Sequence, residues 1–311
     1  MRRRLLPTVV AASAALAAVP AALALLPETP VAASARNEFK PAADFHSNGD
    51  ELVSFSRSRA GHPNRYDAIL RRVSGGITTR IKLNTKGQGH SGGIDSPLVA
   101  YQQVVNGRSN IFVYNIDDLS RTPPAGVNTS RWEYGPTVSG DWLLFGRDDN
   151  RGSTERIVLH RISTHADLRL ARVLRARYSL VPGQVQGNWA TYTRCAPVCN
   201  VIRYEIGAGT RTRLSKPVTS PPRYQFGGAV TSTGVVYLAR SGPRCGSNLK
   251  IVRYFGATDA ANGTVVATLP KGRDLISMFA RENGDGTTDV FYDRVACNTL
   301  RWDVYKVTDG P

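Results

Sequence analysis

The chain has 311 residues, of which 41% are hydrophobic, and it carries a formal net charge of +16 at pH 7. This length allows a sizeable core in one domain or two. Attraction to polyanions is one interpretation of this charge, but the dispersed arginines favour the other, which is codon bias in a GC-rich genome. Because no basic run with interleaved aromatics occurs, the sequence gives no support to nucleic-acid binding.

The first 35 residues have the features of an export signal. An arginine cluster at 2–4 precedes an uncharged Ala/Leu/Val stretch at 5–26, and the small residues 33–35 form a cleavage pattern. We therefore predict a signal peptide at 1–35, cleaved after Ala35, and a protein that is secreted or lies on the exterior of the cell envelope. An uncleaved N-terminal anchor is the alternative, and the basic start fits both Sec and twin-arginine export.

One phrase recurs along the rest of the chain at a nearly constant spacing. It is an apolar strand that closes on an aromatic residue, usually with an arginine two positions later, as in DWLLFGR at 141–147. The aromatics stand at positions 55, 101, 145, 192, 237 and 292. A period of about 46 residues matches the four-stranded blade of a β-propeller. We predict an all-β, six-bladed propeller over residues 36–311.

The strands of each unit follow in the same order. A glycine-bearing first segment, such as GGIDS or FGGAV, precedes the aromatic strand, and a β-branched third strand and a more polar outer strand follow. Residues 165–177 contain enough helix formers for a short helix, but the repeat makes them an outer strand. The sixth unit ends after its third strand, so we expect an N-terminal strand to complete the last blade and close the ring, with residues 36–42 as the donor.

The phrases SNGDELVSFSR and SGDWLLFGR resemble the repeats of the TolB-like group of six-bladed propellers, which are exported bacterial proteins. The resemblance covers residues 36–311 and implies the fold, export and a tendency toward binding roles. Two features depart from the group. The usual Pro-Asp-Gly turn is absent from every unit, and the small domain that precedes the propeller in TolB itself has no counterpart.

Four cysteines lie downstream of the predicted signal. In an exported chain an even count indicates disulfides rather than a metal site. The repeat places all four between the second and third strands of blades 4, 5 and 6. We predict that Cys195 pairs with Cys199 in a small loop and that Cys245 pairs with Cys297, which would join blade 5 to blade 6.

The arginine of the recurring phrase is the candidate ligand-binding feature. It lies two residues from the aromatic in most units and therefore projects from the same face of the strand. The repeat brings these positions to one end of the ring, as candidates for a basic rim that binds an anion: Arg57, Gln103, Arg147, Arg194, Arg240 and Arg294. The alternative is that each side chain bonds to a loop carbonyl or to an acid of a neighbouring blade.

Three other patterns give weaker indications of chemistry. Residues 89–93, GHSGG, match Gly-x-Ser-x-Gly, but we place them in a loop between blades, without the strand-to-helix turn that a nucleophile needs. The five histidines recur at no common position, and we interpret them as surface or loop residues. Residues 282–289 resemble part of a calcium loop, for which a plain hairpin turn is the alternative. We assign no catalytic residue, no metal and no cofactor.

These features favour a non-enzymatic, monomeric binding or scaffold protein. Its partner would be an envelope protein or an anionic polymer. The alternative is a hydrolase or lyase that acts on an anionic polysaccharide over the central channel, since propellers often place active sites there.

Overall fold

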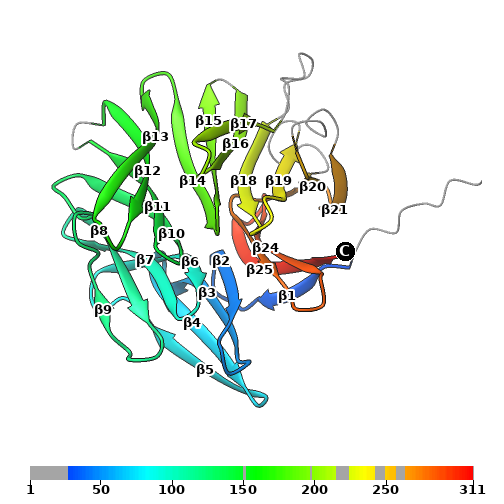
Figure 1. The fold of residues 1–311 in the computed structure, drawn as a ribbon. Coiled ribbons are helices and arrows are strands. Elements are labelled where there is room, and N and C mark those ends of the chain that lie inside the picture. The colour runs from blue at the N-terminus through cyan, green and yellow to red at the C-terminus, as the bar shows by residue number, and fades with distance from the viewer. Residues whose placement is uncertain are drawn as a thin grey trace, which may run out of the picture.

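The computed structural model describes residues 27–149, 152–196, 198–214, 224–241, 249–256 and 263–310. In these ranges every regular element is a β-strand, and no helix is long and apolar enough to cross a membrane. Six antiparallel sheets stand around a common axis, with the first strand of each sheet nearest to it (Figure 1). The predicted six-bladed propeller is therefore confirmed.

The strands follow the predicted order. Blade 1 contains β2 (Glu38–Phe45), β3 (Glu51–Arg59), β4 (His62–Ser74) and β5 (Ile77–Lys82), and blade 2 contains β6 (Gln88–Asp95), β7 (Leu98–Val105), β8 (Arg108–Asn115) and β9 (Arg121–Thr122). Blade 3 contains β10 (Trp132–Ser139), β11 (Trp142–Asp148), β12 (Thr154–Arg161) and β13 (Ala166–Leu174). Blade 4 contains β14 (Ser179–Gln186), β15 (Trp189–Ala196), β16 (Val198–Glu205) and β17 (Thr210–Arg213).

Blade 5 contains β18 (Tyr224–Val230), β19 (Val236–Ser241), β20 (Lys250–Tyr254) and β21 (Thr264–Thr268). Blade 6 contains β22 (Arg273–Asp274), β23 (Met278–Glu282), β24 (Thr288–Ala296) and β25 (Arg301–Asp309), and β1 (Thr29–Ala32) pairs with β25 at its outer edge. Residues 166–174 form the outer strand β13, so the strand prediction for this segment is confirmed over the helix alternative.

The core lies between neighbouring blades. The recurring aromatic of every second strand is buried there: Phe55, Tyr101, Phe145, Tyr192, Tyr237 and Tyr292 are each at most 3% exposed. Because each sheet is covered on both faces, its middle strands can be apolar throughout. This burial explains why the aromatic positions carry the period of the sequence.

The first strands of blades 1 to 5 share a bulge. In blade 3 the pairing with β11 jumps from Tyr134 to Thr137 and leaves two residues unpaired. The equivalent pairs are Lys40-Pro41, Gly92-Gly93, Gly135-Pro136, Gly183-Gln184 and Gly227-Gly228. Neighbouring backbones come very close here, since a Cβ on Gly92 would lie 2.2 Å from the carbonyl oxygen of Pro136. The bulges therefore narrow the ring around its axis.

An N-terminal strand closes the ring as predicted, but the predicted donor, 36–42, is wrong. Most of that segment belongs to β2, the first strand of blade 1, and β1 pairs with β25 instead, with Thr29 opposite Lys306 (Figure 1). The oxygens of Glu28 lie 2.5 Å from the hydroxyl of Tyr292 and 2.5 Å from the guanidinium of Arg294. The closing strand thus lies inside residues 1–35, the expected signal peptide.

Candidate functional site

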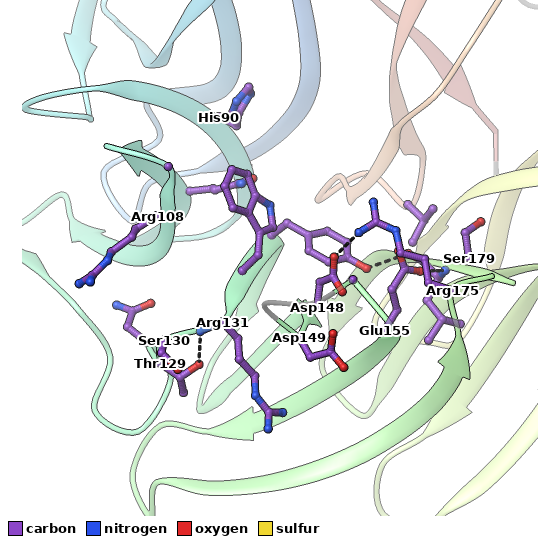
Figure 2. A pocket seen from close by; sticks show the side chains of 18 of the residues that line it. His90, Arg108, Thr129, Ser130, Arg131, Asp148, Asp149, Glu155, Arg175 and Ser179 are labelled. Carbon is purple, nitrogen blue, oxygen red and sulfur yellow. Dashed lines mark hydrogen bonds and ion pairs between the residues drawn. The ribbon is translucent and has the colours of Figure 1, made fainter.

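A large polar cleft opens over blades 2, 3 and 4, on the face where the second strands end. Its volume is about 1430 Å³. The turn between β7 and β8, the segment before β10, the segment after β11 and the start of β14 form its walls (Figure 2). Its charged and aromatic lining residues are Lys40, His90, Arg108, Arg131, Trp132, Tyr134, Asp148, Asp149, Glu155 and Arg175.

Two carboxylates on one side of the cleft are held by an arginine. Arg175 forms a close ion pair with Asp148 and a second one, at 3.5 Å, with Glu155 (Figure 2). The other oxygen of Glu155 accepts a hydrogen bond from the backbone N–H of Leu180 at 2.7 Å. Burial raises the pKa of Asp148, and the charge of Arg175 offsets part of that rise. These contacts fix both carboxylates in place, and Arg175 balances one of their two negative charges.

Tyr134 separates the cleft from the central channel and lines both. Its hydroxyl donates to the carbonyl oxygen of Leu180 at 2.9 Å, which fixes the ring between blades 3 and 4. The ring lies directly on the backbone of Gly146, where an added Cβ would come within 2.3 Å of the Tyr134 Cζ. Glycine at 146 is therefore required by this close approach.

Gly146→Ala is expected to lower the free energy of unfolding by about 2 kcal/mol, because the added methyl group overpacks a buried contact. Gly284→Ala is the matched control, since a Cβ there meets nothing within 4 Å. Chemical denaturation of the two variants measures the difference. Equal stabilities would show that the Tyr134 ring can move aside without cost.

The central channel is narrow and mostly apolar. It has a volume of about 120 Å³ and is lined by the bulges of blades 1 to 5 and by the residues between β22 and β23. Among the described residues that line the channel, Lys40 is the only charged one, and it also lines the cleft. The channel mouth therefore opens into the cleft beside Lys40 and Tyr134.

Most of the side chains predicted to form a basic rim make ion pairs or hydrogen bonds with other residues of the propeller. Arg57 donates to Glu38 at 2.8 Å, and Arg147 donates to Glu133 and to Asp167, both at 3.1 Å. Arg294 pairs with Glu28, and Gln103 accepts from the backbone N–H of Thr85 at 3.1 Å. Arg240 also has a bonding partner, whereas Arg194 stacks on Tyr178, 4.9 Å from its ring centroid. The contacts of Arg57, Arg147 and Arg294 with acids, and of Gln103 with the backbone, are those that the alternative describes.

The pairs Arg57–Glu38 and Arg147–Glu133 are repeats of one local structure. In each, a hydroxyl four residues before the glutamate donates to the same carboxylate: Ser34 at 2.9 Å in blade 1 and Thr129 at 2.6 Å in blade 3. The glutamate is directly opposite the arginine across the first two strands. Residues 34–38 thus have the same structural role as residues 129–133.

A different set of arginines lies on blade 3, and one of them, Arg131, lines the cleft. Arg156 on β12 is directly opposite Arg172 on β13, and Arg131 and Arg169 lie near enough to act on it electrostatically. Burial lowers the pKa of Arg156, and the charges of these arginines and of Arg147 lower it further. Within the described ranges no ion pair joins Arg131, Arg156, Arg169 or Arg172 to an acid. We call these four residues the blade 3 arginine patch.

This patch was not predicted from the sequence. Like charges directly opposite each other on a sheet destabilise it unless something neutralises them. The pairing of Arg156 with Arg172 follows only from the register between β12 and β13, which the sequence phrases did not specify. Arg108 extends the positive charge to the opposite rim of the cleft (Figure 2).

The placement of residues 89–93 in a loop is wrong. They lie within β6, the first strand of blade 2, and Ser91 is 1% exposed. Its hydroxyl bonds to the hydroxyl of Ser54 at 2.9 Å, and no described histidine or acid serves it as a base. The interpretation of the histidines as surface or loop residues also fails for His160, which is fully buried and bonds through Nδ1 to Asp167 at 2.8 Å.

The turn at 283–287 is the hairpin between β23 and β24. The backbone N–H of Asn283 donates to the carbonyl oxygen of Thr287 at 2.9 Å, and Asp285 accepts from Thr287. Asp289 is used in ion pairs with Arg281 and Lys306. Over the described part of the chain, no group of three or more His, Cys, Asp or Glu side chains could hold a metal ion. The hairpin alternative fits this segment.

Cys195 and Cys199 form a disulfide as predicted. They are directly opposite each other at the ends of β15 and β16, so they lie on the strands rather than in a longer loop. Cys297 is also disulfide-bonded. Its predicted partner, Cys245, lies outside the described residues, so that pairing stays a prediction.

The comparisons with known proteins identify the architecture. Neither a known family nor a curated protein matches the sequence. The fold is similar to a protein of unknown function from Dyadobacter fermentans DSM 18053, with a TM-score of 0.62 and 11% identity over 93% of this chain and 99% of that one.

It is also similar to two TolB structures. The match to TolB from Acinetobacter baumannii has a TM-score of 0.55 and 14% identity over 83% of this chain, and it covers 64% of that protein. The match to a putative TolB from Agrobacterium tumefaciens has a TM-score of 0.54 and 11% identity, over 89% of this chain and 92% of that one. At these identities the likeness shows the fold alone, a six-bladed propeller similar to those of the TolB structures.

Proposed function

We propose that this propeller is a non-enzymatic binding protein of the cell envelope or exterior, and that its ligand is an anionic polysaccharide held in the cleft over blades 2 to 4. The observation that carries the proposal is the blade 3 arginine patch, in which Arg156 and Arg172 are directly opposite each other without an acidic partner in the described residues. A polyanion would remove the repulsion between them.

The rest of the cleft suits a polar, extended ligand. Amide and hydroxyl side chains surround an indole, that of Trp132, which is 36% exposed. An aromatic ring with one solvent-exposed face can stack on the apolar face of a sugar, while the polar side chains around the ring bond to the sugar hydroxyl groups. Arg175 balances only one of the two paired carboxylates, Asp148 and Glu155. Asp149 adds a third acid, but Lys40, Arg108 and Arg131 also line the cleft, so its charged lining residues sum to a small positive charge.

Export is supported by the disulfide between Cys195 and Cys199 and by the basic and apolar N-terminal sequence. We propose that a leader is cleaved ahead of Glu28, because Glu28 and β1 are part of the folded blade 6. A second small-residue pattern, Ala22-Leu23-Ala24, lies upstream of that point. Mass measurement of the exported protein tests this; a mature chain that begins at Arg36 would contradict it.

Arg156→Gln with Arg172→Gln is expected to weaken binding of polygalacturonate about tenfold, because each lost surface contact with an anion is worth about 0.5 to 1 kcal/mol. The affinity of the unmodified protein should also fall as salt rises. Arg65→Gln with Arg80→Gln on blade 1 is the matched control, since it removes the same charge elsewhere. Isothermal titration calorimetry at two salt concentrations measures both effects.

Two results would overturn this function. Equal affinity for polygalacturonate and for neutral dextran would exclude the anionic ligand. Steady release of shortened or unsaturated sugars from a panel of anionic polysaccharides would instead support the hydrolase or lyase alternative, with Asp148 and Glu155 as the first residues to test.

A further inference from the structure

Lys40 occupies a bulge position that is glycine in the other four bulged blades. The equivalent residues are Gly92, Gly135, Gly183 and Gly227. The backbone angle φ is +53° at Lys40, and it is also positive at two of the four equivalent glycines, +57° at Gly135 and +67° at Gly227. An L-residue in this left-handed region costs roughly 1 kcal/mol relative to glycine. The backbone conformation at position 40 therefore favours glycine, yet the chain carries a lysine there.

The amine of Lys40 has no ion-pair partner among the described residues. The nearest acid, Asp293, is fully buried and committed to the backbone, since it accepts hydrogen bonds from the N–H groups of Lys40, Ile276 and Ser277 at 3.2, 2.8 and 3.0 Å. It also accepts from the Ser277 hydroxyl. Burial lowers the pKa of Lys40, and the charge of Asp293 offsets this in part. The positive charge of the Lys40 amine is thus poorly balanced by negative charge in the folded protein.

The surroundings of Lys40 define what could compensate it. His90 faces it from β6, and burial, together with the charge of Lys40, lowers the pKa of His90 to about 3, so that its ring is neutral at pH 7. The channel below is apolar and only about 120 Å³, while the cleft above is polar. A compact group with one negative charge fits the channel mouth beside Lys40. A phosphate monoester would bring nearly two charges next to a single lysine and the carboxylate of Asp293.

We propose that Lys40 binds a carboxylate of the ligand at the mouth of the central channel. This inference rests on the proposed function and deepens it: the ligand is a saccharide with sugar-acid residues, one of which points its carboxylate at Lys40 while the chain continues over the blade 3 arginine patch. The Lys40 amine then has a negative counter-charge only when the ligand is bound. The destabilisation that Lys40 causes in the free protein is offset by its contribution to affinity and specificity.

The test uses trigalacturonate and its neutral methyl ester as probes. The unmodified protein is expected to bind the acid at least tenfold more tightly than the ester. Lys40→Gly and Lys40→Met should lose that preference, and Lys40→Gly should unfold at a higher denaturant concentration, because it relieves both the backbone conformation and the buried amine. Lys271→Met, which removes an exposed lysine, is the control and should keep the preference.

The outcomes separate this proposal from the proposed function. If Lys40→Gly keeps the preference for the acid, or if the unmodified protein shows none, Lys40 does not bind the carboxylate, even where long polygalacturonate still binds through Arg156 and Arg172. If the preference for the acid trimer depends on Lys40 while the Arg156/Arg172 variant binds the polymer normally, the carboxylate subsite at Lys40 is supported. Binding of the polymer through the blade 3 arginine patch is then contradicted. An NMR titration of His90 gives an independent readout, since a carboxylate bound at Lys40 should raise its pKa.

Discussion

A chain that begins at Arg36 is expected to be less stable than a chain that begins at Pro27 by about 3 to 5 kcal/mol. The shorter chain lacks β1, whose pairing with β25 covers the outer edge of blade 6. It also lacks Glu28, which bonds to Tyr292 and Arg294, and the Val31 carbonyl oxygen, which accepts from Arg71 at 2.7 Å. Each lost hydrogen bond contributes about 1 kcal/mol, and more where a buried partner is left unpaired.

Chemical denaturation of the two chains measures this difference. Glu28→Gln in the longer chain is the intermediate case, because it keeps the strand and removes only the charge that faces Arg294. We expect it to lose less stability than the truncation. Identical unfolding curves for the chains starting at 27 and 36 would show that the ring does not depend on its N-terminal strand.

Acid is expected to destabilise the protein through His90. In the unfolded chain His90 gains a proton below pH 6.5, whereas burial keeps the folded residue neutral down to its pKa of about 3. The unfolded state therefore binds more protons between these values, and stability falls as pH decreases. Between pH 7 and pH 4 this one group should cost roughly 3 kcal/mol.

His90→Phe should remove this part of the pH dependence. Its ring would remain beside Phe39 and Tyr66, whose centroids lie 6.1 and 5.6 Å from that of His90. His62→Phe, at an exposed position on β4, is the matched control. Denaturation at pH 7 and pH 4 gives the comparison. A stability loss on acidification that is the same in His90→Phe and in the unmodified protein would contradict the assignment.

The blades could be predicted because burial repeats along the chain. The aromatic of each second strand packs between sheets, so its spacing reports the blade length directly. The first strand of blade 1 was missed because Lys40-Pro41 occupies the bulge where the other blades carry glycine, and glycine was the marker used. That omission shifted the expected ring-closing strand from 29–32 to 36–42.

The candidate site could be predicted only in part. The ends of all second strands lie on one side of the ring, as the repeat predicts, and the cleft opens on that side. The partners of the repeated arginines could not be predicted, since the pairing of Arg57 with Glu38 and of Arg147 with Glu133 across the first two strands depends on register. The cleft combines residues of four blades that share no motif, and the blade 3 arginine patch depends on the contact between β12 and β13.

The most direct test of the binding function is hydrogen exchange of the protein with and without a galacturonate oligomer long enough to reach from the channel mouth to blade 3. Non-enzymatic binding in the cleft predicts slower exchange in residues 128–132 and around Lys40, and unchanged exchange on blades 5 and 6. It also predicts that the oligomer is recovered at its original length. Protection confined to other blades, or recovery of shortened oligomers, would contradict it.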